Sequence, residues 1–583
     1  MNRRAFLAIL VLAAAVAAAL RLPELGLRPM HTDEAVHAEK LRALMERGEY
    51  RYNPLEYHGP ALNYFTLPVL ALSGRPRYAD LREWQLRILP ALFGVALLLL
   101  LAGCADGLGR PAAALAAVLM AVSPAMVFYS RYYIMEMLLA FFTVAAIVFG
   151  WRYARSGRLG WAAAAGAAVG LMHATKETWV LSGGAAAVAL AVAWAWGRWV
   201  RGDGPRTRPF GNDVPVGDIR GEAPRLRALH VLAALAVAAG VSVALFSSFG
   251  TNWRGPADSV LTYVYNLSRA GGGADATAGH LHVHPWDYYL RLLLYERHGR
   301  GPLWTQSLIV ALALAGAAAA FVPRRQVADG AGHRSLLRFL AVYSFLLLGI
   351  YSAIPYKTPW CVVAPLTGLI LLAGAGAAAI VRWLRKLPLQ VAAGAVLAAG
   401  TAQLAWQAYR ADFDPRYVAS NYNPYVYAQA LRGAADLGLR VEQVAAVAPG
   451  GFAAMIVKVV ATDHHDFWPL PWYLRRLPPG HVGYYEHPAS GQVEYDSPNV
   501  AMYVVTTAAW DELPKSLRDE LTDPRKYHMS YFGLRPDVAL AVFTRRDLWE
   551  RFLETVRSRR RASTAPATTT RGQADRGDGN NGK

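Results

Sequence analysis

The sequence predicts an α-helical polytopic membrane protein with about eleven transmembrane helices and a small C-terminal α/β extracytoplasmic domain. Apolar runs near the length of a membrane span recur over roughly the first 410 residues. The chain of 583 residues is 54% hydrophobic and only 17% charged, whereas soluble proteins carry about a quarter charged residues. The remaining residues alternate strand-like and helix-like patterns, which is typical of a small α/β fold.

Residues 1–407 form the predicted transmembrane domain, and its apolar runs define the spans. The eleven predicted spans cover residues 5–22, 86–106, 111–129, 134–152, 161–174, 179–197, 228–249, 303–322, 336–354, 360–380 and 388–407. A further apolar piece, from Ala61 to Ser73, is too short to cross a bilayer, so we expect it at the membrane interface.

Arginine clusters orient these spans, because the cytoplasmic loops of membrane proteins are enriched in Arg and Lys. With a cytoplasmic N-terminus, every cluster falls on the cytoplasmic side; the clusters include Arg3, Arg110, Arg152, Arg201, Arg324 and Arg382. We therefore expect a multi-pass protein of the plasma membrane with extracytoplasmic loops 23–85 and 250–302. The basic, Ala-rich start also fits a cleaved signal peptide, and residue 23 emerges outside in either case.

The C-terminal region separates into a domain and a tail. Residues 408–555 are the predicted extracytoplasmic α/β domain, and residues 556–583 are a polar tail that we expect to be disordered. The predicted strands are Val441–Val447, Val500–Thr506 and Val538–Thr544, and the predicted helices are Tyr425–Leu437 and Asp511–Leu521.

Two function classes are disfavoured by composition. The net charge of +19 would suit nucleic-acid binding, but the arginines lie in short loops between spans, where they orient a membrane protein. Cys104 and Cys361 are the only cysteines, and they fall at opposite ends of their spans. We therefore expect neither a disulfide framework nor a Cys-based metal site.

An acidic pair, Asp33-Glu34, opens the first extracytoplasmic loop. In the structural interpretation, Thr32 caps a helix and the two carboxylates complement the helix dipole in its first turn. In the functional interpretation, one carboxylate is a general base that accepts the proton of an attacking hydroxyl. The pair alone does not decide between them.

Three cations lie at the same predicted membrane face, namely Arg131, Lys176 and Lys357. Arg131 is either one half of an interfacial ion pair with Glu136 or a ligand of a phosphate, for which a guanidinium is well shaped. Each lysine alone could equally reach lipid headgroups. Three cations on one face favour a site for a lipid-linked phosphate.

Histidines supply a weaker alternative at this face. His282 and His284 are two residues apart, so in an extended segment both could bind a metal ion, but no third ligand is specified. The segment from Asp463 to Asp466, which also holds two histidines, leaves the same question of a metal site open. The sequence thus requires no cofactor and leaves a divalent cation open.

Several of these motifs resemble a known superfamily. Asp33-Glu34 after the first span, followed by Arg131-Tyr132-Tyr133-Ile134-Met135-Glu136 after the third, is similar to the protein O-mannosyltransferases and the bacterial aminoarabinose transferases. The segment Arg87–Gly94 and Thr175-Lys176 also resemble that superfamily. A narrower resemblance, to the flippase-activity-associated proteins of archaea and bacteria, covers nearly all of residues 1–550. Its motifs are Thr32–Ala35, Tyr57-His58-Gly59-Pro60, Tyr356–Trp360 and Trp468–Arg475.

The resemblance implies a GT-C fold and a membrane glycosyltransferase that uses a polyprenyl-phosphate sugar and inverts the anomeric carbon. It implies that Asp33 is the catalytic carboxylate with Glu34 beside it, and that Arg131 and Glu136 shape the donor and acceptor site. His58, Lys176 and Lys357 are further candidates for donor or acceptor binding. The partners are then the lipid bilayer, the lipid-linked donor and an acceptor that the sequence does not name. The motif departs from the family in having Glu136 where Asp is usual.

The competing hypothesis is a flippase, or a flippase partner, that moves a lipid-linked sugar without transferring it. Such a protein would keep the cationic site but would not need Asp33 as a base. Transporters commonly carry internal repeats with broken helices, and no repeat is apparent here. The sequence therefore favours transfer.

Overall fold

The structure is a computed structural model that describes residues 1–55, 58–201, 224–270, 282–321, 334–486 and 500–564. The chain divides into two compact units, Met1–Arg432 and Gly433–Lys583. The first, the helical unit, extends beyond the predicted boundary at residue 407, because the segment after its last long helix packs back into it. Tyr425 in that segment is fully buried, and its carbonyl accepts a hydrogen bond from the Tyr129 hydroxyl at 2.9 Å.

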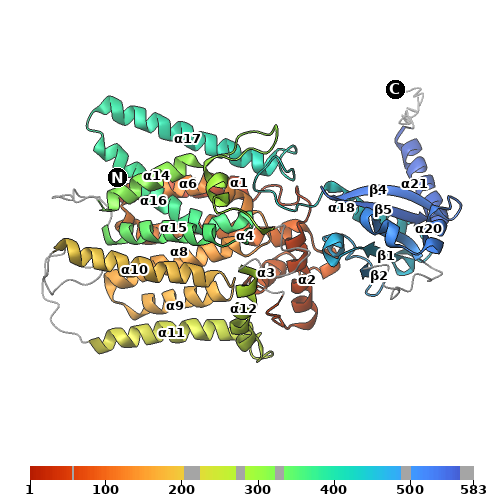
Figure 1. The fold of residues 1–583 in the computed structure, drawn as a ribbon, viewed down its shortest axis with the longest axis horizontal. Helices are drawn as coiled ribbons and strands as arrows, with labels where there is room; N and C mark the ends of the chain where they lie inside the picture. The colour runs from red at the N-terminus through yellow and green to blue at the C-terminus, as the bar shows by residue number, and fades with distance from the viewer. Residues whose placement is uncertain (56–57, 202–223, 271–281, 322–333, 487–499, 565–583) are drawn as a thin grey trace, which may run out of the picture. The chain divides into compact units, whose positions relative to one another are not determined.

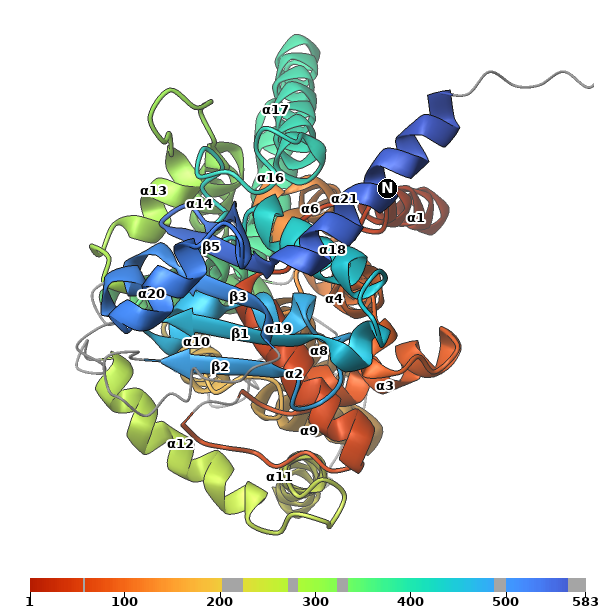
Figure 2. The same ribbon diagram turned by 90° about the vertical axis from the view of Figure 1, so that its right-hand side faces the viewer.

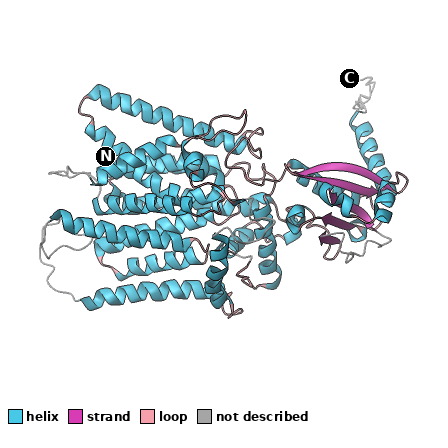
Figure 3. Cartoon of the chain, in the orientation of Figure 1, coloured by secondary structure: helices cyan, strands magenta, loops and turns pink. Residues whose placement is uncertain are grey.

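Long helices dominate the helical unit, as the cyan colouring of Figure 3 shows. They are α1 (Arg3–Arg21), α4 (Glu83–Leu100), α6 (Arg110–Val122), α7 (Pro124–Ser130), α8 (Glu136–Ser156), α9 (Leu159–His173), α10 (Trp179–Arg201), α11 (Pro224–Phe246), α14 (Ser307–Phe321), α15 (Arg334–Ala353), α16 (Val363–Trp383) and α17 (Leu387–Phe413). Each of the eleven predicted spans overlaps at least one of these helices. In the described residues, eight helices are long and apolar enough to cross a membrane, or nine if the bent pair α6–α7 is one span.

The bend between α6 and α7 is 60° and has a local cause. Ser123 precedes Pro124, and the proline ring disfavours a helical conformation in the residue before it. Ser123 accordingly has an extended conformation, with ψ of 121°. The bend ends the span early and delivers the segment after α7, which begins with Arg131, to one end of the unit.

Small residues let the helices of this unit approach closely. A Cβ atom added at Gly376 of α16 would lie 1.8 Å from the carbonyl oxygen of Leu312 in α14, and one added at Gly166 of α9 would lie 2.1 Å from that of Ala234 in α11. Neither position therefore accepts a larger side chain without moving a neighbouring helix. Close packing of this kind stabilises helix pairs in a membrane, where no hydrophobic effect drives their association.

Further helices connect the spans: α2 (Thr32–Arg47), α3 (Ala61–Leu72), α5 (Ala105–Leu108), α12 (Gly255–Ala270) and α13 (Tyr288–Leu294), with 3₁₀ turns η1 (Tyr78–Asp80), η2 (Leu101–Cys104) and η4 (Pro359–Val362). Helices α2, α3 and α12 gather at one end of the helical unit, which we call the α2 end, and α1 begins at the opposite end (Figure 1). The loops that carry the predicted site residues also lie at the α2 end.

The second unit contains a five-stranded sheet of order β2-β1-β3-β5-β4, whose strands lie side by side in Figure 2. The strands are β1 (Ile456–Ala461), β2 (Val482–Glu486), β3 (Val500–Thr506), β4 (Tyr527–Arg535) and β5 (Val538–Arg545). Strands β1, β2 and β3 are parallel, and β5 is antiparallel to both β3 and β4. The helices are α18 (Arg432–Ala445), α19 (Leu470–Tyr473), α20 (Lys515–Thr522) and α21 (Arg546–Thr564), with 3₁₀ turns η5 (Gly451–Ala454), η6 (His464–Phe467) and η8 (Thr507–Glu512).

Two predictions for this region are wrong and two are right. The predicted strand Val441–Val447 begins inside α18, where Leu437, Val441 and Val444 are buried at helical spacing. Helix α21 continues to Thr564, beyond the predicted start of the tail, and residues 565–583 lie outside the described residues. The predicted strands Val500–Thr506 and Val538–Thr544 coincide with β3 and β5.

Candidate functional site

The start of α2 places the acidic pair. His31, rather than the predicted Thr32, is the N-cap residue. The Asp33 backbone N–H donates to His31 Nδ1 at 3.0 Å, and His31 Nε2 lies 2.6 Å from the carbonyl oxygen of Tyr427. Because Nδ1 accepts and Nε2 donates, the imidazole joins the first turn of α2 to the segment that follows α17.

Glu34 occupies the third helical position and is fully buried. Its carboxylate forms a two-pronged pair with Arg87 of α4, at 2.7 Å from Nε and 2.6 Å from Nη2. It also accepts the backbone N–H groups of His31 at 2.9 Å and Tyr133 at 2.8 Å. Although burial opposes ionisation, Arg87 and these N–H groups lower the pKa of Glu34. Glu34 therefore holds the turn in place and is not open to a substrate.

Asp33 differs from its neighbour although it is adjacent in the chain. Its side chain is only partly buried, and within the described residues no hydrogen bond or ion pair involves its carboxylate. Its charge reaches Tyr427, whose pKa is raised by burial and, less strongly, by nearby tyrosines and Asp33. The arrangement presents one unpaired carboxylate on a rigid helix start.

A second pair, Lys176 with Glu136, lies between the C-terminal end of α9 and the start of α8. The Lys176 ammonium donates to Glu136 Oε1 at 2.5 Å, and both side chains are at least 92% buried. Burial alone would favour the neutral amine, but the Glu136 carboxylate raises the pKa of Lys176 well above its usual value. The structure thus pairs Glu136 with Lys176 and not with Arg131.

His58 is the more exposed member of a third pair, with 33% of its side chain exposed. Its Nδ1 lies 2.8 Å from Glu177 Oε2, and His58, against the opposing effect of burial, lowers the pKa of Glu177 to about 2. Gly59 makes this contact possible, because a Cβ atom there would lie 2.2 Å from the Ala174 carbonyl oxygen. The ring of His37, in α2, lies 5.8 Å from that of His58, which brings this pair close to the acidic turn.

Lys357 lies in the short segment between α15 and η4. Its ammonium donates to the carbonyl oxygens of His284 at 3.0 Å and Ile354 at 2.5 Å, and it is 1% exposed. Burial lowers its pKa, and the charge of Asp287 opposes that shift only in part. In the described residues Lys357 donates only to carbonyl oxygens, so no acidic side chain neutralises its charge through an ion pair.

The two histidines near Lys357 do not converge on one point. His282 Nδ1 lies 2.6 Å from the Tyr427 hydroxyl, whereas the ring of His284 stacks on Tyr288 at 4.4 Å. Within the described residues, no group of three or more His, Cys, Asp or Glu side chains is placed to hold a metal ion. The geometry therefore does not favour the metal-site alternative for this pair.

Arg131 contacts protein groups in the structure, whereas one interpretation of the sequence made it a ligand of a phosphate. Its Nε lies 3.1 Å from Asp412 Oδ1, and its other nitrogens donate to carbonyl oxygens at the end of α1, including Pro23 at 2.7 Å. Its guanidinium also packs over the ring of Phe413 at 4.5 Å. Arg131 therefore ties α1 to α17, and the Asp412 carboxylate already provides its counter-charge.

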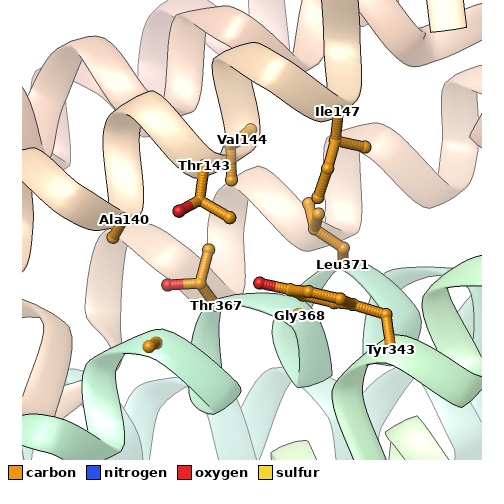
Figure 4. Close-up of a pocket in the computed structure, with 9 residues that line it drawn as sticks. Ala140, Thr143, Val144, Ile147, Tyr343, Thr367, Gly368 and Leu371 are labelled. Carbon is orange, nitrogen blue, oxygen red and sulfur yellow. The ribbon is translucent and has the colours of Figure 1, made fainter. Parts of the chain in front are cut away.

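One small cavity lies within the membrane-spanning core. Figure 4 shows a cavity of about 10 Å³ between α8, α15 and α16, where Thr143, Tyr343 and Thr367 approach one another. This volume holds about one water molecule. A cavity of this size cannot hold a sugar or a lipid phosphate.

Sequence reasoning missed the residues that hold this end together. Arg87 and Asp412 are fully buried charges that fix Glu34 and Arg131. Gln429 Nε2 donates to the Pro29 carbonyl at 2.8 Å and its Oε1 accepts from the Tyr132 hydroxyl. An ionisable residue inside an apolar run is a signal for Arg87 and Asp412, but no local pattern indicates Gln429.

A family model matches part of the chain. Residues 68–248 match dolichyl-phosphate-mannose-protein mannosyltransferase. The match includes Arg131, Glu136 and Lys176 but neither Asp33 nor Lys357. Curated protein sequences gave no match.

Solved structures resemble most of the chain in fold. The ArnT structure from Cupriavidus metallidurans bound to undecaprenyl phosphate has a TM-score of 0.57 at 18% identity, covering 91% of this chain and 97% of that one. The oligosaccharyltransferase AglB from Archaeoglobus fulgidus, in complex with an inhibitory peptide and a dolichol-phosphate, has a TM-score of 0.52 at 12% identity, covering 94% and 77%. The family model thus matches less than half of the chain, and the two structures, at 18% and 12% identity, show that most of the chain shares their fold.

Proposed function

We propose that the protein transfers a sugar from a polyprenyl-phosphate donor to an extracytoplasmic acceptor, with inversion at the anomeric carbon. The donor class is supported by the similar folds of ArnT, bound to undecaprenyl phosphate, and AglB, bound to a dolichol-phosphate. The observation that carries the proposal is the contrast between Asp33, whose carboxylate has no ion-pair partner in the described residues, and the fully engaged Glu34 beside it.

Asp33 is the general base of the proposed reaction. The acceptor oxygen forms a bond to the anomeric carbon while the bond from that carbon to the donor phosphate breaks. The acceptor hydroxyl gives its proton to Asp33, and the polyprenyl phosphate leaves with the bonding electrons. Attack opposite the leaving group inverts the centre, and a positioned carboxylate suits the proton transfer.

Lys357 is the proposed cation for the donor phosphate. It is buried without a carboxylate partner in the described residues, and a fixed cation interacts strongly with an anion where water is excluded. Lys176, held by Glu136, and the partly exposed His58 are the other proposed contacts for donor or acceptor. Arg131 and Glu34 take positioning roles in this proposal, because their partners occupy them.

The test compares transfer with translocation in one preparation. Protein reconstituted in proteoliposomes is supplied with undecaprenyl-phosphate sugars, and both release of undecaprenyl phosphate and movement of the lipid between leaflets are followed. We expect release that depends on Asp33 and persists in the control Glu39→Gln, a partly exposed acid on the same helix that pairs with Arg42. Translocation without release, unaffected by Asp33→Asn, would instead support the flippase hypothesis.

A further inference from the structure

An open cavity of about 750 Å³ lies at the end of the helical unit opposite to α2. The starts of α1 and α6, the short α5 and the ends of α8 and α16 surround it. Four arginines line it, namely Arg3, Arg110, Arg152 and Arg382, together with one carboxylate, Asp106. These arginines belong to the clusters that orient the spans, and the proposed transfer reaction does not use them.

The cavity keeps an excess of positive charge because Asp106 is already paired. Its Oδ2 lies 3.5 Å from Arg152 Nη1 and 3.9 Å from Arg155 Nε, and its Oδ1 accepts from the Trp151 indole at 3.0 Å. Within the described part of the chain, no hydrogen bond or ion pair involves the side chain of Arg3 or Arg110. Two guanidiniums therefore face the cavity without a neutralising partner.

Apolar side chains complete the lining. Phe6 and Leu7 of α1, Leu115 of α6 and Val381 of α16 stand beside the arginines, and Leu7 is 40% exposed. The N-terminus of α6 also opens here without a side-chain cap, so its free N–H groups add positive potential. An occupant that matches this lining carries a compact negative charge joined to hydrocarbon.

We propose that this cavity binds the headgroup of an anionic glycerophospholipid, with its phosphate between Arg3 and Arg110 and an acyl chain along Phe6 and Leu7. Guanidinium groups match phosphate oxygens in a two-pronged geometry. The cavity lies at the ends of membrane-spanning helices, where headgroups lie, and basic pockets between such helices recognise anionic lipids. A soluble phosphate would use the arginines but would leave the apolar wall without a partner.

The test measures lipid binding to the purified full-length protein by native mass spectrometry. Phosphatidylglycerol and phosphatidylcholine are titrated separately, and glycerol 3-phosphate is the soluble counterpart of the headgroup. The double variant Arg3→Gln/Arg110→Gln is compared with Arg4→Gln/Arg385→Gln, which removes the same charge from residues that do not line the cavity, one in α1 and one shortly after α16. Ala102→Trp fills the cavity from an exposed position and keeps every charge.

We expect phosphatidylglycerol to bind more tightly than phosphatidylcholine. Its affinity should fall about thirtyfold in the Arg3/Arg110 variant, since each guanidinium near an anionic headgroup contributes roughly a factor of five, and should fall also in Ala102→Trp. An equal loss of phosphatidylglycerol affinity in the Arg4/Arg385 control would show that general surface charge causes the effect, and it would overturn the proposal. Equally tight phosphatidylcholine or glycerol 3-phosphate binding, or unchanged binding in Ala102→Trp, would overturn it as well.

Discussion

Two groups of charged residues at the α2 end differ in how completely they are paired. In the first group, Glu34 with Arg87 and Arg131 with Asp412 are buried ion pairs that join segments far apart in the chain. In the second group, Asp33 and Lys357 have no oppositely charged partner in the described residues. Similar residue types therefore differ in role. A paired charge holds two segments together, whereas an unpaired charge can take part in the proposed reaction.

The largest expected effect tests the unpaired carboxylate. Asp33→Asn keeps the size and hydrogen bonding of the side chain but removes its basicity, so turnover should fall about 10²- to 10⁴-fold. Thermal stability should stay near that of the wild type, since the carboxylate makes no ion pair to lose. Initial rates of undecaprenyl phosphate release and a thermal unfolding curve measure the two quantities. Wild-type turnover in Asp33→Asn would remove Asp33 from the mechanism.

The paired neighbour should show the opposite pattern. Glu34→Gln leaves the Arg87 guanidinium buried without a counter-charge, and breaking a buried pair in this way costs about 3–5 kcal/mol. We expect a lower unfolding temperature and less folded protein. The fraction that folds should lose less activity per molecule than Asp33→Asn. A fully stable Glu34→Gln that is as inactive as Asp33→Asn would assign catalysis to Glu34.

Replacing Lys357 tests the unpaired cation in the same way. Lys357→Met removes a buried charge that binds only carbonyl oxygens in the described residues, so folding should be preserved. The Michaelis constant for the donor should rise about tenfold or more, since a hydrogen bond to a charged group contributes about 1.5–3 kcal/mol. Arg385→Gln is a control for general charge. An unchanged donor dependence would leave Lys357 as a structural residue.

The smallest effect concerns the pH dependence of stability. The Glu177 pKa of about 2 lies below its ordinary value of 4.5, so its contribution is present above pH 4.5 and is lost as the pH falls toward 2. We expect a loss on the order of 1–3 kcal/mol over that interval. Glu177→Gln should flatten this part of the stability curve, while Glu39→Gln should not. Identical curves for Glu177→Gln and the wild type would show that the His58 pair contributes no net stability.

Part of the candidate site could be predicted from the sequence. Asp33, Glu34, Lys176 and Lys357 are conspicuous because charged residues at span ends are costly to bury. The sequence could not predict the role of each residue, because the role depends on which residue it contacts in the folded protein. Arg131 meets Asp412, and Glu136 meets Lys176, across distances in the chain that no local pattern spans.

The sequence by itself determined the helical, membrane-spanning class of this protein, because length and hydropathy decide which segments can lie in a bilayer. It also located β3 and β5, because their apolar, β-branched runs favour a strand. Only the tertiary structure decided that His31 caps α2 and that Asp33 stays unpaired beside a sealed Glu34. It alone also gathered four arginines around one cavity. Pairing and cavities are properties of segments brought together in space, so the order of residues along one segment does not contain them.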